Sequence, residues 1–124
     1  MRRVLVIVPE GAVDEAENRA RADVSLLELS FAAYNAARSV ADELRSDFDA
    51  AVLMTDAIPP ADADAVARAV RRAARPVIEV RGKRWDGIEP SPISAACRGV
   101  ISGFGVDGIA AAVRLLEQEA AGGR

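Results

Sequence analysis

The sequence predicts a single α/β domain built on a parallel sheet, and three observations support this fold class. Residues 3–8 and 49–55 carry apolar runs that are unbroken rather than alternating, which is typical of strands buried on both faces. Segments with helical spacing lie between the apolar runs, so helical crossovers are expected to join parallel strands. With 124 residues, 51% of them apolar, the chain can bury one hydrophobic core but not two independent ones.

The segment after the first strand has two interpretations. Residues 9–23 are polar and of mixed charge and contain one glycine, so a loop or a weak helical turn is expected there. Ser25 and Glu28 then have the spacing of a capping box, and apolar residues recur at helical spacing behind them, which predicts a helix over 24–45. In the alternative interpretation, residues 24–31 form an additional strand.

The rest of the chain continues the alternation of strands and helices. Two adjacent prolines interrupt it after the second strand, and a later stretch with two glycines and two prolines is expected to be a loop. The expected order is a strand at 49–55, a helix at 63–74, a strand at 76–80, a loop at 81–92, a strand at 99–102 and a helix at 106–119. This order gives a four-stranded sheet, or a five-stranded one in the alternative interpretation.

Composition excludes several classes of function. The 16 basic and 19 acidic side chains give a net charge of −3, so the chain lacks the positive charge expected of a nucleic-acid-binding protein. No apolar run approaches the roughly 20 residues of a membrane helix, and the single cysteine favours a reducing cytoplasm. The absence of histidine excludes histidine-based acid–base catalysis and most zinc sites. Nothing in the sequence specifies a cofactor or a metal.

The loop after the 76–80 strand is the most informative segment for function. Ligands of parallel α/β sheets bind at the carboxyl ends of the strands, and this loop contains Arg81, Lys83 and Arg84 next to Trp85, the only tryptophan. Arginine can grip an anion with its fork of donors, and tryptophan provides a flat apolar wall. The loop therefore predicts a site for a small anionic ligand. Alternatively, it is a solvated basic loop in which Trp85 covers the core or a subunit contact.

Two carboxylates are expected at the same edge of the sheet. Glu10 follows the first strand and Asp56 follows the second. An acid at the mouth of a parallel sheet resembles the phospho-receiver domains, in which Lys83 would be the later lysine. For Asp56, however, a helix-capping or solvated role is favoured. A cluster of Glu10, Asp14 and Asp56 around a metal ion would support the receiver interpretation.

Three further features have structural explanations. Residues 103–108 spell GxGxxG, but the dinucleotide fingerprint follows the first strand of its fold, so close packing of helix on sheet is the favoured explanation. Cys97 is expected to be a small buried apolar residue. Tyr34 lies on the apolar face of its predicted helix and is expected in the core.

Four segments of the C-terminal half follow a recognisable order: Pro76-Val77-Ile78-Glu79-Val80, Ser91-Pro92-Ile93, Gly99 to Gly108, and Ala112 to Leu116. Together they resemble the type II 3-dehydroquinate dehydratases, whose C-terminal third reads PxIEV, a loop, and SPxxxGVIxGxGxxGYxxAL. The likeness is good over 76–117, fair over 40–75 and weak before that. It implies a flavodoxin-like three-layer fold over residues 1–124 and a homo-oligomer built from trimers, up to a dodecamer. Alanine-rich helices with apolar faces to cover also favour a homo-oligomer.

The resemblance implies a catalytic site that this chain does not reproduce. The family uses a tyrosine on a lid as base, a histidine as acid, and asparagines that hold the substrate. At the matching positions the asparagine is Met54, the acid histidine is Pro60, and the histidine after the EV strand is Arg81, while the segment around Arg19 and Arg21 has no tyrosine. Because each such role contributes about 10²–10⁴-fold to rate, the expected protein is a divergent member without the parent reaction.

Three hypotheses for function follow. The first is a repurposed enzyme with lyase- or isomerase-type chemistry on a small cyclic or anionic metabolite, with Glu10, Asp56 and Lys83 as catalytic candidates. The second is a non-catalytic homologue that binds a ligand or supports an assembly. The third is an unrelated receiver-like module. The candidate substrate-binding residues are Arg19, Arg81, Arg84, Trp85 and Ser91.

Overall fold

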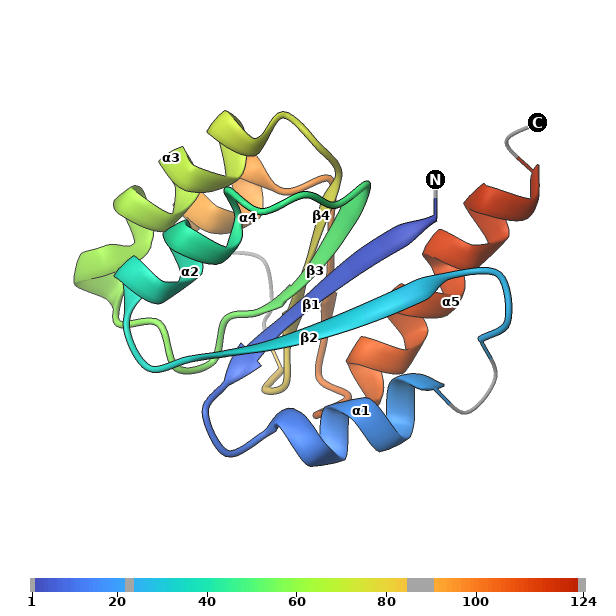
Figure 1. Ribbon diagram of the computed structural model, residues 1–124. Coiled ribbons are helices and arrows are strands. Elements are labelled where there is room, and N and C mark those ends of the chain that lie inside the picture. Colours follow the sequence, from blue (N-terminus) through green and yellow to red (C-terminus); the bar gives the residue numbers. More distant parts are fainter. Residues whose placement is uncertain (1, 22–23, 85–90, 123–124) are drawn as a thin grey trace.

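The computed structural model describes residues 2–21, 24–84 and 91–122, and this part of the chain forms an α/β fold. Strands and helices alternate from the first element to the last (Figure 1). The elements are β1 (Arg3–Pro9), α1 (Val13–Arg21), β2 (Glu28–Tyr34), α2 (Ala37–Glu43), β3 (Ala50–Met54), the 3₁₀ turn η1 (Pro60–Asp62), α3 (Ala63–Ala73), β4 (Val77–Arg81), α4 (Pro92–Ala96), β5 (Gly99–Ser102) and α5 (Asp107–Gly122).

The described strands form one five-stranded parallel sheet with the order β2-β1-β3-β4-β5. This is the order of flavodoxin-like sheets, so the predicted fold class is confirmed. Because β1 and β3 are adjacent and parallel, the loops that follow them leave the sheet at the same edge. The carboxyl ends of β3, β4 and β5 meet at that edge in the same way.

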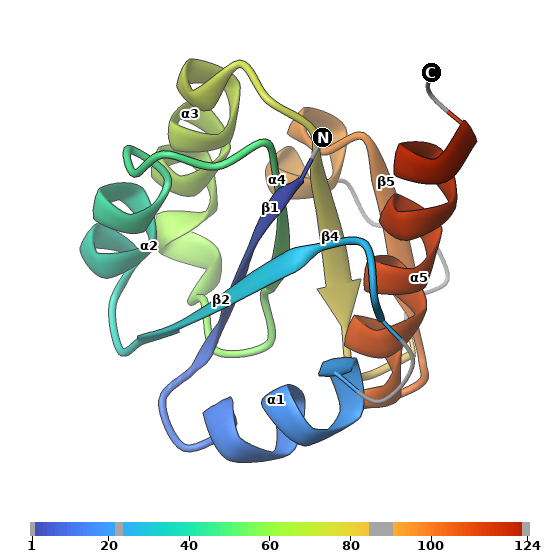
Figure 2. The same ribbon diagram turned by 45° about the vertical axis from the view of Figure 1, so that its right-hand side comes forward.

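Helices cover both faces of the sheet. Helices α1 and α5 lie on one face, and α2, α3 and α4 lie on the other (Figure 2). Along β1, Val4, Val6 and Val8 belong to the core on the α5 side, while Leu5 and Ile7 belong to the core on the α3 side. Burial on both faces explains why the apolar runs in the sequence do not alternate with polar residues.

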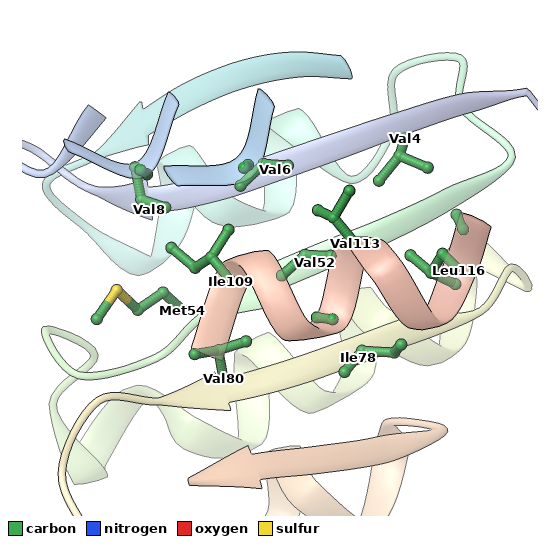
Figure 3. Packing of buried hydrophobic residues seen from close by; sticks show 14 residues of the cluster. Val4, Val6, Val8, Val52, Met54, Ile78, Val80, Ile109, Val113 and Leu116 are labelled. Atoms are coloured by element: carbon green, nitrogen blue, oxygen red, sulfur yellow. The ribbon is translucent and has the colours of Figure 1, made fainter. Parts of the chain in front are cut away.

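The core on the α5 side depends on close contact between helix and sheet. Ile109, Val113 and Leu116 recur at helical spacing and point toward the strands (Figure 3). At the start of α5, a Cβ atom on Gly108 would lie 2.9 Å from Cγ1 of Val80, so only glycine allows this approach. The GxGxxG sequence is therefore explained by packing, as expected.

Residues 24–45 do not form the single helix that their spacing predicts. Residues 28–34 are β2, which pairs with β1 over its full length, and α2 begins only at Ala37. Leu29 and Phe31 pack on the α5 side, whereas Ala32 and Tyr34 pack on the α2 side. The apolar residues of this segment fit both periods. Pairing with β1 decides between them, because it places Leu29 and Phe31 against one core and Ala32 and Tyr34 against the other.

The expected capping box is also wrong, because Ser25 and Glu28 begin no helix. The backbone N–H groups of Ser25 and Leu26 each donate to Oε2 of Glu117 on α5 at 2.8 Å. These two hydrogen bonds tie the segment before β2 to the last helix. The segment that resembles a helix start thus makes a tertiary contact through its backbone.

One helix lies in a segment where a loop or a weak helical turn was expected. Residues 13–21 form α1, whose Ala16 and Ala20 are buried in the core that α5 shares. In the predicted 81–92 loop, Arg81 still belongs to β4 and Pro92 already begins α4, while residues 85–90 lie outside the described residues. Within the described part of the chain, no helix is long and apolar enough to cross a membrane.

Candidate ligand-binding site

A cavity of about 410 Å³ opens at the carboxyl edge of the sheet. We call it the carboxyl-edge cavity. It lies where the ends of β3 and β4 meet η1, the start of α3 and the start of α4. Its size falls in the range of small-molecule sites, about 300–1,000 Å³. The lining residues are Thr55, Asp56, Ile58, Pro60, Ala63, Asp64, Glu79, Arg81, Ser91, Pro92 and Ile93.

Strand pairing fixes the inner wall of this cavity. The N–H of Thr55 donates to the carbonyl of Val80 at 3.1 Å, which extends the β3–β4 ladder and brings Thr55 beside Glu79. Successive side chains of a strand point to opposite faces. Val77 packs on the α3 and α4 side, so Glu79 and Arg81 point to that side as well.

Glu79 is a carboxylate with no exposed surface, and among the described residues it is the one buried charged or polar side chain. Its Oε2 accepts a hydrogen bond from Thr55 Oγ1 at 2.6 Å and from Arg81 Nε at 3.1 Å. Its Oε1 accepts a hydrogen bond from Ser94 Oγ. Burial of an ionised carboxylate is unfavourable unless it is paired and hydrogen-bonded, and Glu79 meets both conditions.

Arg81 is held by the same network from the other side. Its side chain is 24% exposed, and its Nη2 donates to Ser91 Oγ at 2.6 Å and to Ser94 Oγ at 3.2 Å. Ser91 also caps α4, since its Oγ accepts the N–H of Ser94 at 3.2 Å. The short helix α4 thus presents two hydroxyls that fix the guanidinium in the cavity wall.

Glu79 and Arg81 have different roles in this network. Both oxygens of Glu79 already accept hydrogen bonds, and the residue has no contact with solvent, so its role is to position Arg81. Arginine remains a cation at all accessible pH values and provides donors in a planar fork. The network therefore fixes a positive charge in the cavity wall, and Arg81 cannot transfer a proton there.

Asp56 connects the loop after β3 to the turn after β4. Its Oδ1 accepts the N–H of Gly82 at 2.8 Å, and its Oδ2 accepts the N–H of Lys83 at 3.3 Å. A Cβ atom on Gly82 would lie 3.0 Å from Cε of Met54 and 3.3 Å from Oδ2 of Asp56, so a side chain there would crowd this contact. Asp56 lines the cavity while it holds the two loops together.

Tyr34 lies at the end of β2 and is 2% exposed, as expected of a core residue. Its hydroxyl donates to the carbonyl of Met54 at 2.7 Å and accepts the N–H of Ala57 at 3.3 Å. Burial raises the pKa of Tyr34 to about 12, the Ala57 hydrogen bond opposes this rise, and the charge of Asp56 adds to it. A phenol with this pKa and these contacts is a structural group rather than a base.

Cys97 is half-buried and packs beside the core on the α3 side. Its burial, together with the negative charge of Glu79, raises the pKa of the thiol to about 12. Reactive cysteines have lowered pKa values, so Cys97 has the character of an inert structural thiol. The residue was expected to be buried, and the structure leaves it partly exposed beside the core.

The structure brings together only some of the residues proposed from the sequence. Arg81, Ser91 and Asp56 line the carboxyl-edge cavity, and Lys83 directly follows the turn that Asp56 holds. Glu10, Lys83 and Arg84 are exposed and do not line it. Arg19 pairs with Asp107 at 2.7 Å, which joins α1 to α5 away from the cavity lining. Trp85 lies outside the described residues.

The metal cluster that would favour a receiver domain is not formed in the described part of the chain. There, no group of three or more cysteine, aspartate or glutamate side chains is placed to hold a metal ion. Glu10 and Asp14 are exposed, and the Asp56 carboxylate faces the backbone of Gly82 and Lys83.

Glu79, Thr55 and Ser94 are site residues that were not among those proposed from the sequence. A signal for Glu79 was available, because it is the one charged residue within the apolar strand Val77–Val80. A charge in a strand that is buried on both faces needs partners, which predicts a polar network around it. The sequence gives no comparable signal for Thr55 and Ser94, whose roles depend on the pairing of β3 with β4 and on the position of α4.

The fold and the cavity define a flavodoxin-like α/β protein with a site at the carboxyl edge of its sheet. No protein-family model and no curated protein matches the sequence. Solved structures do match it. The type II dehydroquinase from Butyrivibrio crossotus superposes with a TM-score of 0.70 at 18% identity, over 94% of this chain and 97% of that one. The type II dehydroquinase from Propionibacterium acnes gives a TM-score of 0.59 at 19% identity, over 95% and 99%.

A second type of protein shares the same fold. The RcsB response regulator of Salmonella typhimurium superposes with a TM-score of 0.67 at 8% identity, over 99% of this chain and 61% of that one. At these identities the likeness concerns the fold alone. The chain therefore has a dehydroquinase-like, flavodoxin-like fold, and the site residues must carry any argument about function.

Proposed function

We propose that this protein binds a small hydroxylated carboxylate in the carboxyl-edge cavity. The observation that carries the proposal is the Glu79–Arg81 pair in the cavity wall, because it fixes an arginine at the position where a ligand would contact the sheet. The guanidinium, which Glu79, Ser91 and Ser94 hold in place, would attract a carboxylate by its positive charge. The hydroxyls of Thr55 and Ser91 would hydrogen-bond to the ligand's hydroxyl groups, and Ile93 would contact its carbon frame.

Isothermal titration calorimetry tests this proposal. Quinate, a cyclic hydroxylated carboxylate, is expected to bind, and inositol, a cyclic polyol without a carboxylate, is expected to bind at least tenfold more weakly. Arg81→Lys keeps the charge but loses the fork, so it should weaken quinate binding without affecting inositol. Arg114→Gln on the exposed side of α5 is the control with an ordinary surface arginine. Equal affinity for the two compounds would contradict the proposal.

We further propose that the chain is a divergent relative of the type II dehydroquinases that lacks their reaction. The order of motifs in its C-terminal half and its dehydroquinase-like fold support the relationship. The family's tyrosine base and histidine acid have no counterpart. The chain has no histidine, and its one tyrosine, Tyr34, is buried and donates a hydrogen bond to the carbonyl of Met54.

The purified protein should therefore show no turnover of 3-dehydroquinate. The measurement is the ultraviolet absorbance of the conjugated product, with an active dehydroquinase as the positive control. Loss of both the acid and the base removes roughly 10⁴–10⁸-fold of rate acceleration if the two factors multiply. Turnover above the uncatalysed rate would refute this prediction.

Lyase- or isomerase-type catalysis on another substrate is the second candidate function. One observation favours it: Asp56 and Asp64 line the cavity beside Arg81, so a carboxylate could take a proton from the carbon next to a bound carboxylate. Lys83 is the candidate acid; it does not line the cavity, so its side chain would have to reach the ligand from the turn that Asp56 holds. The carbon next to the carboxylate of quinate carries no hydrogen, so mandelate, a hydroxylated carboxylate with a hydrogen on that carbon, is the ligand for this test. In D₂O, NMR should show exchange of that hydrogen for deuterium. Asp56→Asn should abolish the exchange and preserve binding, whereas a bound ligand without exchange supports a non-catalytic protein.

We also propose that the protein is a homo-oligomer built from trimers, as its relationship to the dehydroquinases suggests. Exposed apolar side chains such as Leu26 and Leu115, which are 55% and 45% exposed, support association. Light scattering should give a mass that is a multiple of three chains. A mass of 13.1 kDa, that of one chain, would contradict the proposal.

A further inference from the structure

A second cavity lies between α2 and α3, away from the carboxyl-edge cavity. Its volume is about 470 Å³, and four arginines line it: Arg45 after α2, Arg68 and Arg72 on α3, and Arg75 after α3. Four alanines and Leu44 complete its lining. We call it the arginine groove. It shares no lining residue with the carboxyl-edge cavity, because only the start of α3 reaches the latter.

The positive charge of the arginine groove is only partly neutralised. Arg45 pairs with Asp42 at 3.7 Å, and Arg75 donates to the carbonyl of Ser46 at 3.4 Å. Arg75 also lies over the ring of Phe48, at 5.2 Å from its centre. Arg68 and Arg72, both exposed, make no ion pair or hydrogen bond with any described residue.

No described carboxylate lines the groove, although acidic residues outnumber basic ones by 19 to 16 in the whole chain. Like charges so close together repel one another at low ionic strength, and a bound anion would relieve this repulsion. The two arginines without partners are one helical turn apart, Arg68 and Arg72, so their guanidinium groups can reach one ligand.

The size of the groove and the charge of the whole molecule indicate what kind of anion fits. From Ala65 to Ala73 the groove runs for about 12 Å along α3, the rise of eight helical residues. The net charge of −3 repels long polyanions such as nucleic acid, whereas the local charge attracts short ones. Arginine matches phosphate geometry with its fork of donors.

We propose that the arginine groove binds a short linear polyphosphate, either free or as the polyphosphate of a nucleotide. Arg68 and Arg72 contact neighbouring phosphates, and the alanines leave room for the chain of phosphates. Arg45 and Arg75 lie together at the end of the groove where the chain after α2 meets the chain after α3, and they contact the terminal phosphate. This site is independent of the carboxylate site proposed above.

Titration calorimetry with inorganic tripolyphosphate at low ionic strength tests this proposal. Arg68→Gln and Arg72→Gln should each weaken binding at least tenfold. Arg71→Gln is the matched control, since Arg71 is an exposed arginine of the same helix that does not line the groove, and it should change affinity less than twofold. Because all three side chains are exposed, far-UV circular dichroism should show unchanged folding.

Further titrations identify the source of the polyphosphate. The affinity for metal-free adenosine triphosphate is compared with that for tripolyphosphate. Tighter binding of adenosine triphosphate indicates that the site takes a nucleotide, and equal affinity indicates free polyphosphate. Equal loss of binding in the Arg71 and Arg68 variants would overturn the proposal, because it would indicate attraction to surface charge alone. Binding of an acidic peptide or an oligonucleotide without any binding of tripolyphosphate would overturn it as well.

Discussion

Replacing Arg81 with leucine should lower the free energy of unfolding by about 3–5 kcal/mol at neutral pH. The change leaves Glu79, which has no exposed surface, as a buried carboxylate without its cation. Removal of one partner of a buried ion pair has effects of this size because the remaining charge is neither paired nor hydrated. Urea unfolding followed by far-UV circular dichroism measures the loss.

The double variant separates an unpaired charge from a simple loss of packing. Glu79→Leu combined with Arg81→Leu removes both charges, and such replacements are often close to neutral. The double variant should therefore be more stable than Arg81→Leu alone by about 2 kcal/mol or more. Arg114→Leu, at an exposed position on α5, serves as the control and should change stability by no more than about 0.5 kcal/mol. A double variant that is less stable than Arg81→Leu alone would contradict this explanation. It would mean that the unpaired carboxylate of Glu79 is not the cause of the lost stability.

Stability should also fall steeply between pH 10 and 12 because of Tyr34. The pKa of this phenol is 10.0 in the unfolded chain and about 12 in the folded one, chiefly because of burial. Between these values the folded state keeps the proton and the unfolded state releases it, so each pH unit favours unfolding by about 1.4 kcal/mol. The contribution is fully present below pH 10 and has been lost, by about 2–3 kcal/mol in total, above pH 12.

Tyr34→Phe is the matched variant, because phenylalanine keeps the ring and removes the titrating group. At neutral pH it should lower stability by about 1–2 kcal/mol through loss of the hydrogen bond to Met54, but it should lack the additional loss above pH 10. The raised pKa of Cys97 gives both proteins the same further decline, so their difference reports Tyr34 alone. Tyr34 is the only tyrosine, so the absorbance of tyrosinate gives its pKa directly. A folded-state pKa near 10 would contradict this account.

The sequence predicted the parts of the fold that depend on local chemistry. The apolar runs of β1 and β3 identified buried parallel strands, and the spacing along α3 and α5 identified two helices within one to three residues of their ends. The glycine at position 108 indicated close packing. For β2, local pattern was insufficient, because its apolar residues fit both a helix and a strand, and pairing with β1 settled the outcome.

The candidate site shows the same division. From the sequence alone, the carboxyl ends of the strands were predicted as the place for a ligand, and three of the residues named there, Arg81, Ser91 and Asp56, line the cavity. The tertiary structure decided which charges meet: it joined Arg81 to Glu79, turned Arg19 toward Asp107 and placed Glu10 on the exposed surface. Strand and helix propensities act over a few residues and can be recognised in sequence. Burial of one carboxylate beside one arginine depends on where β3, β4 and α4 meet, and only the folded chain determines that.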